Sequence, residues 1–182
     1  AAGSGKSTFL TLVGGITTAS NGEIVINGKN ITSMSKKELA KFRLENIGFV
    51  FQAYNLIPEM TAYQNIILPL KLAHKKIDKK YLSDICNKLS ISDRLSHLPS
   101  ELSGGQQQRV AIARALITKP SILLCDEPTG NLDKKSSEDV LDLLTQLCAD
   151  NGCTLILVTH DKSVADRMGR IITISDGEIL ED

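Results

Sequence analysis

The sequence predicts an α/β fold in which a mostly parallel sheet is flanked by helices. Short apolar runs at 47–51, 122–125 and 154–158 have the length and the branched side chains of buried strands. Helices are predicted over 103–118, before a Lys-Pro pair, and over 136–148, where Leu and Val recur with helical spacing. Buried strands that alternate with helices are typical of a parallel sheet covered on both faces.

Smaller elements surround this core and add an antiparallel part. An Asn-Gly pair favours a type I′ turn and predicts a hairpin near residues 23–31. An Asp-Gly pair predicts a second hairpin over 171–180. Short helices are expected over 7–13 and 35–44, and after Asp161 as the capping residue.

Residues 53–102 carry helix signals in place of strand patterns and are predicted to form a helical insertion rather than an independent domain. Thr61 and Gln64 have the spacing of a capping box, so a helix is expected to begin there. Pro69 is expected to interrupt or kink it, and Asp78 can cap a second helix. We therefore expect a single domain over 1–182, with a core formed by 1–52 and 103–182 and a helical subdomain at 53–102.

The composition limits the classes of function. The chain has 182 residues, the size of one domain, and 42% hydrophobic residues exclude global disorder. Its 21 basic and 21 acidic residues give a net charge of 0, which argues against a nucleic-acid partner. No apolar run approaches the roughly 20 residues that span a bilayer. The four cysteines lack the spacing of a zinc or redox motif, so we expect free thiols.

The first residues suit a polyphosphate ligand. They are Gly3, Ser4, Gly5, Lys6, Ser7 and Thr8. They match the second half of the phosphate-loop pattern, whose first glycine would lie just before Ala1, so we expect the chain to be a fragment. Glycines let backbone N–H groups close on phosphates, the lysine reaches the β and γ phosphates, and the serine binds Mg²⁺. The alternative is a flexible Gly-Ser turn before a helix.

Two adjacent carboxylates, Asp126 and Glu127, follow the apolar run at 122–125. The ends of strands in an open α/β sheet are where ligands bind. Two neighbouring carboxylates at a buried strand end are uncommon, because both must stay solvated or paired. A metal partner at Asp126 and a water-activating base at Glu127 would explain both. The alternative is a solvated Asp-Glu-Pro turn.

A second candidate anion site lies at the start of the predicted helix over 103–118. Ser103 is a good N-cap, and Gly104, Gly105 and Gln106 follow it. Two anion-binding helix starts for one nucleotide make sense if two copies of the chain pair head to tail. Each nucleotide would then touch the phosphate loop of one copy and the Ser-Gly-Gly of the other. The alternative is an ordinary helix cap.

Two further polar residues follow predicted strands directly. His160 comes after the run at 154–158, and we expect it beside Glu127 and in contact with the γ-phosphate. Gln52 ends the run at 47–51 and could reach the metal or the attacking water. A structural histidine and a polar loop residue are the simpler alternatives.

Taken in order, these motifs resemble the ATP-binding subunit of an ABC transporter, a phosphate-loop NTPase. The order is the phosphate loop, Gln52, the segment 102–106, the segment 122–127, Asp133 and His160. The insertion at 53–102 is similar to the family's helical subdomain. The segments 52–58, 65–70 and 127–133 resemble the subgroup for lipoprotein release, macrolide export and antimicrobial-peptide resistance. The family's adenine-stacking aromatic residue has no counterpart in this chain.

The resemblance implies ATP and Mg²⁺ as cofactors and ATP hydrolysis as the activity. Glu127 would act as the base with His160, Lys6 and Gln52 as further catalytic groups, and Ser7, Gln52 and Asp126 would hold Mg²⁺. Residues expected to contact ATP in trans are Ser103, Gly104, Gly105, Gln106 and Asp133. The partners would be a second copy or a similar subunit and a transmembrane permease, at the cytoplasmic face of the cell membrane.

The resulting hypothesis is a subunit that dimerises on ATP and drives a permease for lipophilic or peptide-like substrates. Two other classes stay open. The same ATPase core occurs in soluble ABC proteins of translation and chromosome maintenance. Only 49 residues separate Gln52 from Leu102, which argues against the chromosome type with its long coiled coils. The translation type, which carries two such cores per chain, stays open. An ATP-gated clamp that signals to a membrane protein without transport is the other. The substrate and the direction of transport depend on the partner.

Overall fold

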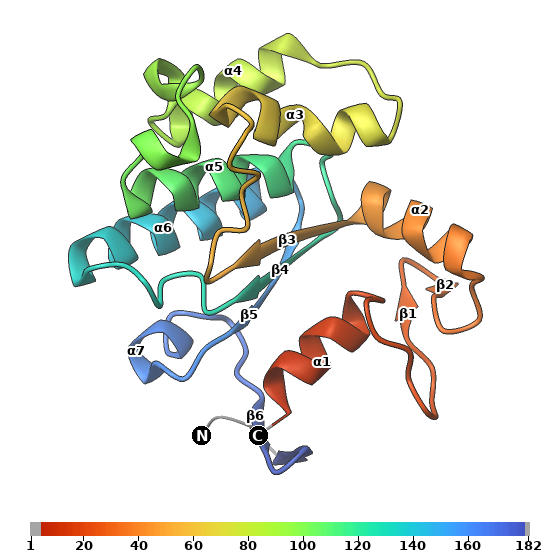
Figure 1. Cartoon of the computed structure of the whole chain (residues 1–182). Helices are drawn as coiled ribbons and strands as arrows, with labels where there is room; N and C mark the ends of the chain where they lie inside the picture. Colours follow the sequence, from red (N-terminus) through yellow and green to blue (C-terminus); the bar gives the residue numbers. More distant parts are fainter. Residues whose placement is uncertain (1–4, 181–182) are drawn as a thin grey trace.

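The computed structural model describes residues 5–180 and contains a three-stranded parallel sheet at its centre (Figure 1). The strands are β3 (Ile47–Phe51), β4 (Ile122–Asp126) and β5 (Thr154–Val158), in the order β3-β4-β5. Phe51 pairs with Asp126, and Asp126 pairs with Val158. All three strands therefore end at one edge of the sheet, as the sequence predicted.

Helices cover both faces of this sheet. Helices α5 (Gly104–Leu116) and α6 (Lys134–Asp150) lie on one face, and α1 (Lys6–Val13) lies on the other (Figure 1). Alternate residues of β4 serve the two sides: Leu123 belongs to the apolar cluster that includes α5 and α6, whereas Leu124 packs in a second cluster with Leu10. This alternation explains why the run at 122–125 is apolar without interruption.

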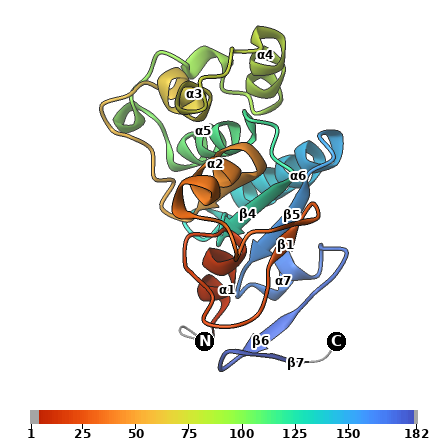
Figure 2. The same cartoon turned by 90° about the vertical axis from the view of Figure 1, so that its right-hand side faces the viewer.

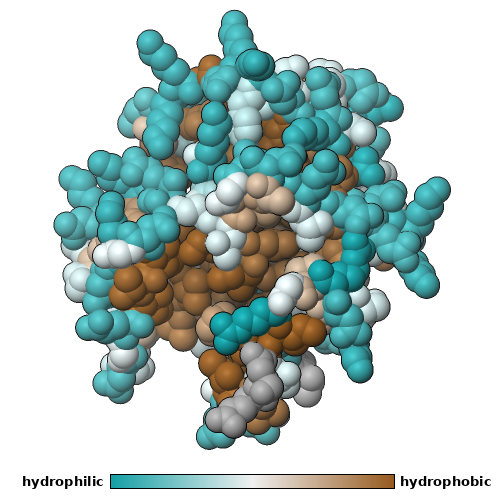
Figure 3. All heavy atoms as spheres, turned by 180° about the vertical axis from the view of Figure 1, so that it is seen from behind, coloured by the Kyte–Doolittle hydropathy of each residue, from teal (hydrophilic) through white to brown (hydrophobic). Residues whose placement is uncertain are grey.

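The run at 154–158 forms the predicted strand, but it is less buried than expected. Only Val158 is buried, and Thr154 is exposed. Among residues 5–180, β5 pairs with β4 alone, so it forms an edge of the sheet (Figure 2). Figure 3 views the molecule from the side of β5 and α6 and shows apolar surface across this face. An edge strand lacks a neighbour on one side, and its apolar side chains are covered less.

Helices α3 (Ala62–Leu72) and α4 (Lys79–Lys88) lie beyond α5, followed by two short 3₁₀ turns, Ser92–Arg94 and Pro99–Glu101 (Figures 1 and 2). Thr61 and Gln64 form the predicted capping box, and Asp78 caps α4. Pro69 does not end α3, which continues to Leu72. The buried residues Ile66, Ile67 and Leu70 hold that turn in place despite the missing N–H.

The helical segment has no core of its own. Its buried residues share one apolar cluster with α5, α6 and the sheet; those from α3 and α4 include Ile66, Ile67, Leu82 and Ile85. The strongest packing between the two parts is that of α3 on α5. The segment therefore depends on the core to bury its apolar face.

Both predicted hairpins are present. Strands β1 (Val25–Ile26) and β2 (Lys29–Asn30) are joined by Asn27 and Gly28, whose φ angles of 51° and 73° confirm the type I′ turn. Strands β6 (Thr173–Ser175) and β7 (Glu178–Leu180) form the second hairpin. The remaining helices are α2 (Lys36–Asn46) and α7 (Lys162–Ala165), which Ser35 and Asp161 cap. Over the described residues, no helix combines the length and the apolar character required to cross a membrane.

Candidate functional site

The polar residues that follow the three paired strands lie side by side at one edge of the sheet. Gln52 follows β3, Glu127 follows β4 and Thr159 follows β5. Because the strands are parallel and in register, residues far apart in sequence meet at this edge. The open edge of a parallel sheet is where ligand sites of α/β proteins form.

Helix α1, which packs against β4 and β5, begins after Gly5, its N-cap. Gly5 has φ 92°, and a Cβ atom there would lie 3.1 Å from the Cα atom of Gly177. Both the backbone conformation and the close approach therefore require glycine. Lys6 is partly buried, whereas Ser7 and Thr8 are exposed at the amino end of the helix, whose free N–H groups favour an anion. The predicted site residues Gly3 and Ser4 lie outside the described residues.

Ser7 and Asp126 are brought together although they lie in different elements. Burial and the neighbouring charge of Glu127 raise the pKa of Asp126, and an interaction with the Ser7 hydroxyl offsets part of this rise, so the net shift is upward. A hydroxyl beside a partly desolvated carboxylate is an oxygen donor set that fits Mg²⁺, and a bound cation would relieve the repulsion between the two carboxylates.

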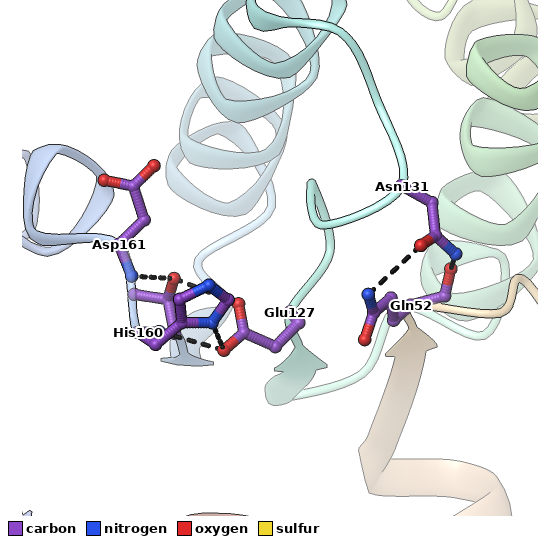
Figure 4. Close-up of polar contacts among 6 residues, drawn as sticks. Gln52, Glu127, Asn131, His160 and Asp161 are labelled. Carbon is purple, nitrogen blue, oxygen red and sulfur yellow. Dashed lines mark hydrogen bonds and ion pairs between the residues drawn. The ribbon is translucent and has the colours of Figure 1, made fainter. Parts of the chain in front are cut away.

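The side chain of Glu127 is held by two residues that follow β5 (Figure 4). Its Oε2 atom accepts a hydrogen bond from the Thr159 hydroxyl at 3.1 Å, and its Oε1 atom accepts one from the backbone N–H of His160 at 2.9 Å. The Nδ1 atom of His160 lies 2.7 Å from the same Oε1. Glu127 itself has φ 47°, in the left-handed region that non-glycine residues seldom adopt. The carboxylate therefore has a defined position before any ligand is present.

Gln52 is held by Asn131, which precedes α6 (Figure 4). Its Nε2 atom donates to Asn131 Oδ1 at 3.1 Å, and Asn131 Nδ2 donates to the backbone oxygen of Gln52 at 2.9 Å. The amide of Gln52 lies against Gly130, where a Cβ atom would be 2.7 Å from Nε2. The loop between β4 and α6 is thus hydrogen-bonded to the residue that follows β3.

The predicted second anion site is not brought to the first within one chain. Ser103 caps α5 and forms a capping box with Gln106, whose backbone N–H donates to Ser103 Oγ at 3.3 Å. Gly104 faces the Tyr54 hydroxyl, and Gly105 borders open space. Helix α5 lies on the opposite face of the sheet from α1, which carries Lys6 (Figure 1). Within one chain these residues therefore lie apart from Lys6.

Asp133 caps α6. Its side chain accepts hydrogen bonds from the backbone N–H of Ser136 at 3.0 Å and from its hydroxyl at 2.6 Å. These hydrogen bonds lower the pKa of Asp133, which is therefore ionised at neutral pH. Its role within the chain is structural, and its exposed position leaves it accessible to a second molecule.

Sequence reasoning missed several residues that position this site. Asn131 and Thr159 hold Gln52 and Glu127, as described above. Arg114 donates to the backbone oxygens of Asn55 at 2.6 Å and Tyr54 at 2.8 Å, and so supports the loop that follows Gln52. Only the position of Thr159, directly after a strand and before His160, carried a signal in the sequence; the other two act through contacts that the fold creates.

The sequence pattern of the ABC transporter family matches residues 1–130. The chain belongs to the ABC transporter family. Members of this family have the predicted phosphate-loop NTPase fold and hydrolyse ATP.

Curated relatives and solved structures agree with this membership. The chain is 48% identical to the ABC transporter ATP-binding protein YtrE of Bacillus subtilis, over 90% of this chain and 71% of that protein. It is 43% identical to the lipoprotein-releasing system ATP-binding protein LolD of Francisella tularensis, over 97% of this chain and 78% of that protein. The macrolide export ATP-binding/permease protein MacB of Bartonella quintana is 47% identical, over 100% of this chain and 28% of that protein.

A solved ABC cassette superposes on the whole chain. It is the ATP-binding cassette MJ0796, described as dimeric, in a post-hydrolysis state and bound to ADP and phosphate, with a TM-score of 0.89 and 41% identity. The alignment covers 100% of this chain and 81% of that one. The chain is thus an ATP-binding and ATP-hydrolysing subunit of the ABC transporter type, as the sequence motifs predicted.

Proposed function

We propose that this ABC subunit hydrolyses ATP at the edge where β3, β4 and β5 end. The observation that carries the proposal is the Glu127 carboxylate, which Thr159 and His160 hold at this edge, next to Asp126. Lys6 and the N–H groups at the start of α1 bind the β and γ phosphates. Ser7, Asp126 and Gln52 hold Mg²⁺, which supplies charge compensation for the phosphates when bound.

Glu127 orients the attacking water and accepts its proton. Thr159 and His160 fix the carboxylate at two oxygen atoms, so that little reorganisation is needed when the water is polarised. His160 is exposed at 75% of its side-chain surface, which leaves its ring free to reach a γ-phosphate. Phosphoryl transfer depends mainly on positioned charge, and this arrangement supplies it.

A second copy of the chain, or a similar subunit, completes the site. Ser103, Gly104, Gly105 and Gln106 at the start of α5, together with Asp133, contact the ATP of the other subunit. Support comes from their exposed or partly exposed positions, from the open space at Gly105 and from the dimeric cassette structure. ATP bridging two subunits favours the closed dimer, and hydrolysis opens it.

The dimer drives a transmembrane permease, which docks on a groove between the core and residues 53–102. The groove has a volume of about 600 Å³, and its lining includes Phe49, Phe51, Asn55, Leu72 and Arg114. The groove borders the loop after Gln52. A displacement of Gln52 at the ATP site would therefore move the wall of the groove directly. Residues 53–102 act here as the helical subdomain, at the inner face of the cell membrane. The names of LolD and MacB favour lipophilic or peptide-like substrates.

The decisive experiment replaces the proposed base in the intact protein. The Glu127→Gln variant should bind ATP normally, lose at least about 10²-fold in turnover and accumulate as an ATP-bound dimer. The matched control is Glu138→Gln, an exposed glutamate on α6 that should keep wild-type turnover. Size-exclusion chromatography with ATP and a phosphate-release assay give both readouts. Unchanged turnover, or a monomer with trapped ATP, would contradict the proposal.

Docking to the permease is tested on the groove itself. Leu72 is 62% exposed, so Leu72→Asp should fold normally and weaken co-purification with the permease without changing the ATPase rate of the isolated subunit. Ile179→Asp, equally exposed at 63% but on β7, is the control. Transport into vesicles, measured beside ATP hydrolysis, separates a transporter from a clamp that only signals.

A further inference from the structure

The contact between Gln52 and Asn131 joins two amides in a defined direction (Figure 4). The residues lie 79 positions apart in the sequence, at the end of β3 and before α6. Gln52 uses its side-chain Nε2 and its backbone oxygen, so both its side chain and its main chain are held.

The backbone oxygen of Gln52 determines the orientation of both side chains. A carbonyl oxygen can only accept hydrogen bonds, so it must face the NH₂ group of Asn131. This leaves Asn131 Oδ1, which also only accepts, opposite the amide of Gln52. Gln52 must therefore present Nε2 to Asn131, and its Oε1 atom takes the other end. Figure 4 shows this oxygen pointing away from Asn131.

Gly130 keeps the Gln52 amide close to the loop. A Cβ atom at this position would lie 2.7 Å from Nε2 and 3.1 Å from Cδ of Gln52, closer than the side chain allows. The φ angle of Gly130 is not among the positive ones, so its backbone would accept alanine. Glycine is needed here for space rather than for conformation.

We propose that Asn131 is a positioning residue that turns the oxygen end of the Gln52 amide toward the metal of the ATP site. This inference rests on the proposed function, in which Gln52 is a metal ligand. Mg²⁺ takes oxygen ligands, and an amide that presented its NH₂ group instead would repel the cation. Without Asn131 the amide can adopt both orientations, and only one of them binds the metal.

The experiment measures metal binding rather than turnover. Mn²⁺ replaces Mg²⁺ in the intact protein saturated with a non-hydrolysable ATP analogue, and bound Mn²⁺ is followed by electron paramagnetic resonance. Asn131→Ala and Gly130→Ala should each weaken Mn²⁺ binding by about 3- to 10-fold, the range expected for the loss of one or two hydrogen bonds. Affinity for the metal-free nucleotide should stay at the wild-type value, which a merely structural role would not predict.

Two further variants decide whether Asn131 acts through Gln52. In a Gln52→Ala background, Asn131→Ala should cause no additional loss of Mn²⁺. Asn87→Ala, which removes an exposed asparagine bonded to Ser92 on another part of the surface, is the control and should bind Mn²⁺ normally. Wild-type Mn²⁺ affinity in both Asn131→Ala and Gly130→Ala, or an undiminished effect without Gln52, overturns the inference. If the wild-type protein binds nucleotide but no Mn²⁺, the proposed metal site itself is wrong.

Discussion

Glu127 and His160 are joined twice: the same carboxylate oxygen accepts the backbone N–H of His160 at 2.9 Å and lies 2.7 Å from its Nδ1 atom. The backbone contact depends on the pairing of β4 with β5, and the ring contact depends on the rotamer of the histidine. The main chain therefore holds the carboxylate in place, while the imidazole remains available for a ligand.

Removal of the imidazole should impair turnover more than folding. His160→Ala leaves the backbone N–H and Thr159 in contact with Glu127, so the stability should change little, because the side chain is largely exposed. We expect kcat to fall by about 10²-fold or more with a smaller change in KM for ATP. Steady-state ATPase assays check this, with the exposed neighbour Lys162→Ala as control. Full turnover in His160→Ala would contradict the role.

Asp126 should make the protein less stable as the pH rises. Burial and the charge of Glu127 raise its pKa above the ordinary value of 3.8, so the folded state binds this proton more tightly than the unfolded state. The stability from this group is present below pH 3.8 and is lost as the pH rises through the higher folded pKa.

Asp126→Asn should therefore unfold at a higher temperature than the wild type at pH 7, while the difference disappears near pH 3.8. The same variant should lose ATP hydrolysis, because the carboxylate is a proposed metal ligand. Calorimetric scans between pH 3.5 and 7 would detect the trend. A variant less stable than the wild type at pH 7 would show that the interaction of Asp126 with Ser7 outweighs burial.

Gly5 combines two constraints that a pair of alanine variants can separate. Gly22 has a similar φ of 87° but open space around it, whereas Gly5 also approaches Gly177. Gly22→Ala should cost about 1–2 kcal/mol in the free energy of unfolding, and Gly5→Ala should cost more. Urea denaturation measures both. Equal losses would show that the close approach to Gly177 relaxes without penalty.

Arg114 should control the mobility of the loop after Gln52. It donates to two backbone oxygens there, and its side chain is partly buried, so water replaces these hydrogen bonds only in part when the side chain is removed. Arg114→Ala should speed hydrogen exchange over residues 53–58 and leave β5 unaffected. Arg109→Ala is the control, since Arg109 donates to the backbone oxygen of Leu89 at 3.3 Å rather than to this loop. Unchanged exchange over 53–58 would argue that the loop is held by Asn65, whose amide bonds Ile57.

Local patterns in the sequence predicted the strands, the helix caps and both hairpin turns. The signals were short: apolar runs for β3 and β4, Thr three residues before Gln for the cap of α3, and Asn-Gly for the turn. Each of these signals involves residues only a few positions apart, so it can be recognised in the sequence without knowledge of the tertiary structure. Errors arose where distant contacts decide: β5 is less covered than its apolar run suggested, and α3 continues past Pro69 because its buried face is packed.

By itself, the sequence determined which chemical groups this ABC subunit offers: a lysine and a serine at a glycine-flanked helix start, two carboxylates after an apolar strand, and a histidine after another. Only the tertiary structure decided which of them touch. The parallel register sets Glu127 beside Thr159 and His160, the packing of α1 under the sheet brings Ser7 to Asp126, and the bare backbone of Gly130 lets Gln52 reach Asn131. These contacts join residues tens of positions apart, and they form because the apolar faces of sheet and helices must be buried together.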